Sequence, residues 1–179
     1  EVWNPSFPQH AVAAAQGAVL GLADQTAADP YRFIFPPDGV FFLNALRYHS
    51  QRSVEVFEIF ERVFGSPDRL VRVIGGWLPD SLELATQVAG DILDWQQASR
   101  KADAYAGALY FGTFLASQES RIAVEAMSAE TILDTAVADL RLLLGIGAGL
   151  SEFISERDLE FMAYESGHSL VEPSETHYS

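Results

Sequence analysis

Residues whose side chains could take part in chemistry stand where strands are predicted to end. Glu165 follows the apolar segment 159–164, and Trp77 and Tyr110 close two other strand-like segments. Glu1 joins them if a strand precedes it. Active sites of parallel α/β proteins lie at the carboxyl ends of their strands. A carboxylate that ends an apolar strand and precedes Ser-Gly-His is poorly suited to packing, so Glu165 is a candidate functional residue.

The pattern of apolar residues predicts helices over 10–23, 40–64, about 81–95 and 128–145, with a further helical turn at 151–157. The clearest is 40–64, where apolar residues recur every three or four positions from Leu43 to Phe64. Asp80 or Ser81 can cap the third helix. The Pro- and Gly-containing residues 24–39 are interpreted as an ordered loop.

Three glycines, Gly145, Gly147 and Gly149, are spaced as in some phosphate-binding loops. No strand is predicted before them and no Lys follows, as such a loop would require. We therefore interpret them as a turn that ends the helix 128–145.

Short segments rich in β-branched or aromatic residues predict strands at 70–77, 103–111 and 159–164. Strands that alternate with helices indicate an α/β fold with a parallel sheet. Three strands, with a fourth if one ends before Glu1, amount to about half of an eight-stranded (β/α)8 barrel. Half a barrel leaves unpaired sheet edges. The chain is therefore either a fragment holding about strands four to seven of such a barrel or a small open α/β sheet.

The composition narrows the classes of partner. The 179 residues include 25 Asp and Glu but only 11 Lys and Arg, for a net charge of −14. Such a surface repels nucleic-acid phosphates and anionic membranes, while uncharged sugars remain possible ligands. The absence of Cys excludes disulfides and zinc–thiolate sites. The sequence does not indicate an oligomeric state.

The ends of the chain carry their own expectations. The sequence begins with Glu rather than Met and has no recognisable signal peptide. We therefore expect Glu1 to lie inside a longer gene product. Residues 1–171 are predicted to form the folded domain, and 172–179 a polar tail.

Several segments resemble one protein family. The opening Glu1-Val2-Trp3-Asn4 and the tract AYESGHSLV at 163–171 resemble clan A glycoside hydrolases, in particular a poorly characterised bacterial group. The segments 50–65, 68–76 and 102–112 add to the resemblance. It covers most of residues 1–171, but the chain lacks the Asn expected just before the first Glu and has no counterpart of strands one to three and eight.

The resemblance implies a retaining hydrolase that acts on a glycan by double displacement. In this interpretation Glu165 is the nucleophile, Glu1 the acid/base, and Tyr110 orients the nucleophile. Trp77, Trp3 and His168 would line the sugar subsites. The two carboxyl groups should then lie about 5–5.5 Å apart. The resemblance also implies a secreted protein, and no metal or cofactor is expected.

Two other interpretations remain open. The chain could be a non-catalytic, sugar-binding relative with the same barrel. It could also be a small soluble α/β interaction protein in which the two motifs are coincidences.

Overall fold

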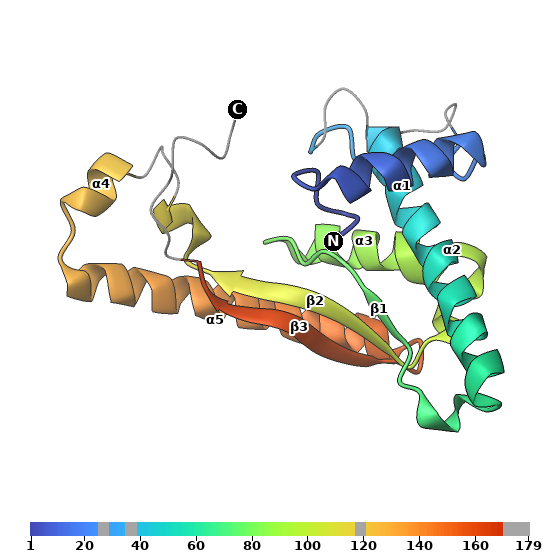
Figure 1. Cartoon of the computed structure of the whole chain (residues 1–179). Coiled ribbons are helices and arrows are strands. Elements are labelled where there is room, and N and C mark those ends of the chain that lie inside the picture. Colours follow the sequence, from blue (N-terminus) through green and yellow to red (C-terminus); the bar gives the residue numbers. More distant parts are fainter. Residues whose placement is uncertain (25–28, 35–38, 117–120, 170–179) are drawn as a thin grey trace.

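The computed structural model describes residues 1–24, 29–34, 39–116 and 121–169. The helices are α1 (Pro8–Val19), α2 (Gly39–Phe64), α3 (Leu82–Leu93), α4 (Arg121–Glu125) and α5 (Ala129–Ser155), and the strands are β1 (Val73–Gly75), β2 (Ala104–Phe111) and β3 (Glu160–His168). Short 3₁₀ segments occur at Pro67–Arg69, Trp95–Lys101 and Thr113–Ala116. Figure 1 shows these elements in chain order.

The three strands form one parallel sheet in the order β1–β2–β3. Neighbours in the sheet are therefore consecutive in the chain, and the predicted α/β class with a parallel sheet is confirmed. The connections between the strands run through α3 and α5, as crossovers between parallel strands require.

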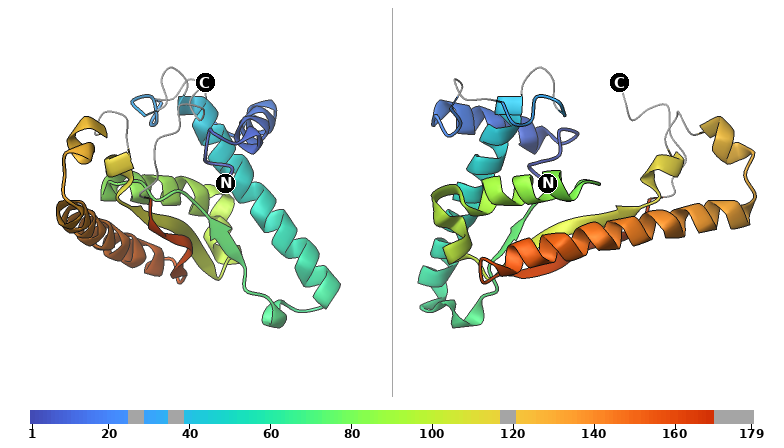
Figure 2. Two further views of the ribbon diagram at one scale, coloured as in Figure 1. Left: turned by 60° about the vertical axis from the view of Figure 1, so that its left-hand side comes forward. Right: turned by 180° about the vertical axis from the view of Figure 1, so that it is seen from behind.

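Helices α3 and α5 pack against each other on one face of the sheet. Figure 2 shows α5 in front of the strands when the molecule is seen from behind. Ile74 and Tyr105 point to this side and are fully buried. They join a core to which α3 contributes Ala85, Val88, Ala89 and Ile92 and α5 contributes Leu143, Ile146, Leu150 and Ile154.

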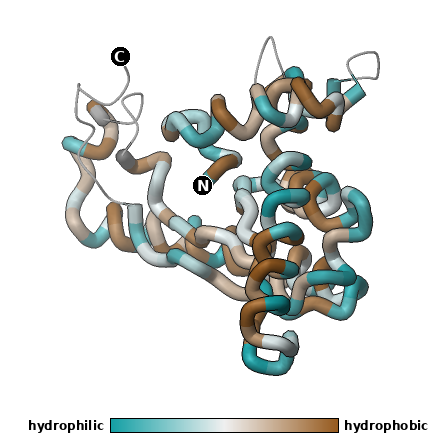
Figure 3. The backbone as a smooth tube through the Cα atoms, turned by 45° about the vertical axis from the view of Figure 1, so that its right-hand side comes forward, coloured by the Kyte–Doolittle hydropathy of each residue, from teal (hydrophilic) through white to brown (hydrophobic). Residues whose placement is uncertain are grey.

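Helix α2 crosses this layer and carries α1 on its amino-terminal half. Along α2, hydrophobic residues recur at helical spacing (Figure 3). Leu46 and Ser50 are fully buried, and the Ser50 hydroxyl donates to the Ile92 carbonyl at 2.6 Å, which joins α2 to α3. Gly17 of α1 lies directly against the backbone of Asn44, so the two helices approach more closely than any side chain there would allow.

The structure corrects the predicted end of the long helix. Helix α5 continues through Gly145, Gly147 and Gly149 to Ser155, so the turn predicted at the glycines is wrong. The reason is tertiary packing. Gly147 faces Leu109 and Phe161 of the sheet, and Gly149 lies against Leu82, so the absence of side chains permits close contact that offsets their low helix propensity.

Two strand predictions also need correction. The strand predicted at 70–77 is only Val73–Gly75, and that predicted at 159–164 extends to His168. Glu165 therefore lies within an exposed strand instead of at a turn after a buried one. The extension forms because β2 supplies backbone partners as far as Phe111.

The remaining predicted elements are close to those observed. The helix predicted at 40–64 is α2, and Ser81 caps α3 as predicted. Helix α1 stops at Val19, before the positive φ of 65° at Gly21. The predicted tail 172–179 lies outside the described residues, as does part of the predicted loop 24–39. In the described residues no helix is both long and apolar enough to cross a membrane.

The glycine contacts yield a paired stability prediction. A Cβ at Gly17 would lie 2.4 Å from the Asn44 carbonyl oxygen, whereas one at Gly145 meets no atom of the described chain within 4 Å. We expect Gly17→Ala to lower the free energy of unfolding by about 1–2 kcal/mol through overpacking. Gly145→Ala should raise it by about 0.5–1 kcal/mol through helix propensity. Urea unfolding followed by circular dichroism measures both, and equal effects would contradict the close packing of α1 on α2.

Candidate active site

A β-bulge in β3 determines which side chains share the face of the sheet opposite α3 and α5. Gly107 is paired with Ala163, but Ala108 is paired with Glu165, so Tyr164 is the extra residue. Side chains alternate along a regular strand, and a bulge interrupts that alternation. Tyr164 and Glu165 consequently share one face with Tyr110 instead of pointing to opposite sides.

The side chain of Glu165 is held by its neighbour in the sheet. The Tyr110 hydroxyl donates a short hydrogen bond to the Glu165 carboxylate, and both side chains are exposed. This bond, with the negative charges of Glu165 and Glu1, raises the pKa of Tyr110 above its usual value. Tyr110 is therefore a neutral donor at neutral pH.

Glu1 is held in the same manner by two donors. The Tyr164 hydroxyl donates to its Oε1 at 2.7 Å, and the Asn4 amide donates to its Oε2 at 2.8 Å. Burial raises the pKa of Glu1, but these two hydrogen bonds and the nearby α-ammonium group outweigh it. The pKa of Glu1 is consequently lower than usual, so its carboxylate is charged at neutral pH.

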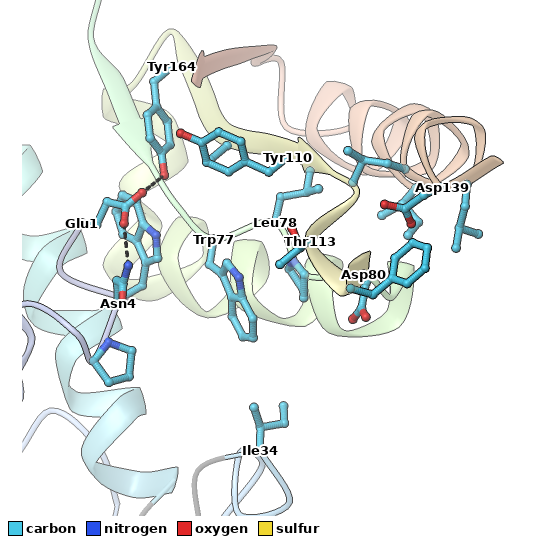
Figure 4. Close-up of a pocket in the computed structure, with 18 residues that line it drawn as sticks. Glu1, Asn4, Ile34, Trp77, Leu78, Asp80, Tyr110, Thr113, Asp139 and Tyr164 are labelled. Carbon is cyan, nitrogen blue, oxygen red and sulfur yellow. Dashed lines mark hydrogen bonds between the residues drawn. The ribbon is translucent and has the colours of Figure 1, made fainter. Parts of the chain in front are cut away.

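The two carboxylates belong to one electrostatic group. Burial and the hydrogen bond to Glu1 raise the pKa of Tyr164, and the charge of Glu165 contributes to the same shift. Tyr110, bonded to Glu165, is in turn influenced by the charge of Glu1. Figure 4 shows the Tyr110 and Tyr164 rings next to each other, with Glu1 bonded to the latter. The structure thus brings residues 1 and 165 to one region of the sheet.

The segment 1–7 is anchored beneath Glu1 by two histidines. The Val2 carbonyl oxygen is 2.8 Å from Nδ1 of His10. The buried Trp3 ring lies 5.3 Å from the His49 ring, and Nε2 of His49 donates to the Gly75 carbonyl at 2.8 Å. A Cβ on Gly75 would come within 2.9 Å of the Trp3 ring, so this glycine makes room for Trp3 against β1.

A cavity of about 640 Å³ opens beside these residues, near the carboxyl ends of β1 and β2 (Figure 4). Its size falls in the range of small-molecule sites. One end of the cavity is lined by Glu1 and by four aromatic side chains, Trp3, Trp77, Tyr110 and Tyr164. The other end is formed by the loop after β1, the segment after β2 and α5, with Asp80, Thr113, Phe114, Asp139, Leu142 and Ile146.

Most of the candidate residues from the sequence lie at the cavity, but one does not. Glu1, Trp3, Trp77 and Tyr110 line the cavity, and Glu165 adjoins it through its bond with Tyr110. His168 is different, because it is paired with Phe111 and its ring packs 6.5 Å from that ring. Its place in the register puts it on the other face of the sheet, away from Glu165.

Three residues of this region were missed by sequence reasoning. Tyr164 was interpreted as part of an apolar strand, because strand alternation places it opposite Glu165 and nothing in the sequence marks the bulge. Asn4 belongs to the opening motif, but the sequence does not indicate its bond to Glu1. Asp139 lies on the predicted helix 128–145, three and four residues before the apolar Leu142 and Leu143. A polar residue on the same helix face as these leucines is the sequence signal that could have identified it.

The described residues contain no cluster of three or more His, Asp or Glu side chains placed to hold a metal ion. No protein-family model matches the chain, and neither a curated protein nor a solved structure shows significant similarity to it.

The buried His49 provides a prediction about pH. Burial lowers its pKa from 6.5 to about 4, so the folded protein binds fewer protons than the unfolded chain between these values. Its contribution to stability is complete above pH 6.5 and is lost as the pH falls toward 4, by about 3 kcal/mol in all. We expect His49→Gln, whose amide can still donate to Gly75, to remove this part of the pH dependence.

The measurement is urea unfolding of both proteins from pH 7.5 to pH 4. Carboxylates titrate in both proteins, so the difference between the two curves isolates His49. Parallel curves over the whole range would show that this ring is not buried in its uncharged form.

Proposed function

We propose that this chain carries the site of a retaining glycoside hydrolase, with Glu165 as nucleophile and Glu1 as acid/base. One observation carries the proposal. Two carboxylates, each hydrogen-bonded by its own tyrosine, lie on the same face of a parallel sheet beside an aromatic cavity. Most glycoside hydrolases use a pair of carboxyl groups as catalytic residues, and aromatic rings pack against the apolar faces of sugars.

The proposed reaction has two steps at the anomeric carbon. Glu165 attacks that carbon while Glu1 protonates the departing glycosidic oxygen, which forms a glycosyl-enzyme ester. Glu1 then removes a proton from water, and the water oxygen displaces Glu165 with net retention of configuration. Tyr110 holds the Glu165 carboxylate in place, and Trp3 and Trp77 offer rings against which the sugar can pack.

We further infer that the described sheet is part of a (β/α)8 barrel. Support comes from the sequential order β1–β2–β3 with α3 and α5 on one face, since doubly wound sheets reverse their order and carry helices on both faces. The opposite face carries small residues at Gly75, Ala104, Ala106 and Ala108. Both β1 and β3 are edge strands, to which further strands can pair.

Two observations favour non-catalytic sugar binding as a second candidate. A general acid must hold a proton near neutral pH, yet the pKa of Glu1 is lowered. Glu165 also adjoins the cavity without lining it. A sugar-binding protein needs only the aromatic rings and hydrogen-bonding carboxylates, so the two candidates differ in covalent chemistry at Glu165.

Covalent trapping tests this difference. In 2-deoxy-2-fluoroglycosyl fluorides the 2-fluorine slows both the formation and the hydrolysis of the glycosyl-enzyme. The fluoride leaving group makes formation fast again, so the glycosyl-enzyme accumulates. With a panel of common pyranoses we expect one reagent to add a single sugar per chain, attached to Glu165. Glu165→Gln should abolish the adduct, and Glu160→Gln, at the start of the same strand, should not.

Intact and peptide mass spectrometry measures the adduct and its position. Attachment to another carboxylate would overturn the assignment of Glu165. Reversible sugar binding without any adduct would overturn the hydrolase in favour of the sugar-binding candidate.

The two tyrosines give a paired prediction on the rate of trapping. The Tyr110 hydroxyl fixes the orientation of the Glu165 carboxylate, and misplacing a reacting group by about 1 Å can cost about a hundredfold in rate. We therefore expect Tyr110→Phe to slow the labelling of Glu165 by about ten- to a hundredfold at saturating reagent. Fluoride leaves without a proton, so Tyr164→Phe, which removes a hydrogen bond to Glu1 but none to Glu165, should label at the wild-type rate. Equal slowing in both variants would contradict the separate roles.

A further inference from the structure

The cavity has a second acidic region, remote from Glu1. Asp139 projects from α5, and its Oδ2 accepts a hydrogen bond of 2.6 Å from the backbone N–H of Gly112. Asp80 lies across from it in the loop after β1 (Figure 4). Phe114, Leu142 and Leu143 form the apolar surface around these carboxylates. The far end of the cavity thus combines acceptor oxygens with apolar walls, and the Asp139 carboxylate is held in place by Gly112.

The charge of the cavity lining has one sign. The charged side chains among the described lining residues are Glu1, Asp80 and Asp139, with no Lys, Arg or His beside them. At the far end, the described lining residues include no basic group that could offset Asp80 and Asp139. A ligand group placed there therefore meets uncompensated negative charge in a partly enclosed space, where electrostatic interactions exceed those in bulk water.

We propose that the cavity selects uncharged glycans over acidic ones, and that Asp80 and Asp139 set this preference. Sugar hydroxyls donate hydrogen bonds to the two carboxylates, and the apolar ring faces pack on the leucine and phenylalanine side chains. A uronate or sulfate group at the same place brings like charges together, which costs binding energy. This inference rests on the proposed glycan ligand but requires no covalent step.

The experiment uses matched pairs of short oligosaccharides that differ only in the oxidation of the hydroxymethyl carbon. One member is neutral and the other is the corresponding uronide, with gluco, galacto and manno pairs in the panel. Titration calorimetry and quenching of tryptophan fluorescence measure the dissociation constants at low and high salt. We expect at least one neutral oligosaccharide to bind roughly tenfold or more tightly than its uronide at low salt, with a smaller ratio at high salt.

Three substitutions, combined in two variants, assign the preference. Asp139→Asn retains an oxygen that can accept from Gly112, and with Asp80→Asn it removes both charges from the far end. The double variant should bind both members of a pair with nearly equal affinity. Asp134→Asn removes the same charge from α5 outside the cavity lining and should keep the wild-type ratio.

The outcomes separate this inference from the catalytic proposal. Uronides that bind as tightly as neutral sugars, or a ratio unchanged in the double variant, would overturn the selectivity while leaving trapping at Glu165 intact. Selective neutral binding without trapping would support the selectivity and overturn only the hydrolase. If no oligosaccharide of the panel binds, both proposals fail.

Discussion

The pairing of β2 with β3, and the bulge within it, is the constraint on which the candidate site depends. Without the extra residue, strand alternation would send Tyr164 and Glu165 to opposite faces. A regular strand could place Glu165 beside Tyr110, or Tyr164 beside Glu1, but it could not do both. Because the register shifts between Gly107 and Ala108, both glutamates receive a tyrosine hydroxyl on one face. Bulges commonly re-aim side chains beside active sites, and here the effect is to assemble a four-residue group.

Small residues on the same face make the assembly possible. This face of β2 carries only short side chains at Ala104, Ala106 and Ala108. On β1, Gly75 lets the Trp3 ring lie against the strand. A side chain at Gly75 would push the Trp3 ring, and the segment 1–7 with it, away from the sheet. On the other face the same strands carry Ile74 and Tyr105, which are fully buried under α3 and α5. One face of the sheet is therefore packed against helices, and the other carries the candidate site.

The sequence predicted those features that depend on local pattern and missed those that depend on neighbours. Helix α2 was predicted almost to its ends, because its apolar residues recur over the whole length and Gly65-Ser66-Pro67 terminates it. Helix α5 was predicted to end early, since close packing of Gly147 and Gly149 is a property of the facing strands and of Leu82. The bulge is likewise a property of two strands, so Tyr164 was missed. Glu1, Trp3, Trp77, Tyr110 and Glu165 were chosen as candidates from motifs and strand ends, and the structure brings them together.

The hydrogen bonds of Glu1 restrict how it could act as an acid. Each of its oxygens accepts one bond, from Tyr164 at Oε1 and from Asn4 at Oε2. A protonated carboxyl must place its hydrogen on one oxygen, and an amide N–H₂ group cannot accept it. The Tyr164 hydroxyl can reverse its role and become an acceptor, so the proton fits at Oε1. Under the proposed mechanism Tyr164 is therefore the group that permits Glu1 to exist in both protonation states, while Asn4 fixes the orientation of its other oxygen.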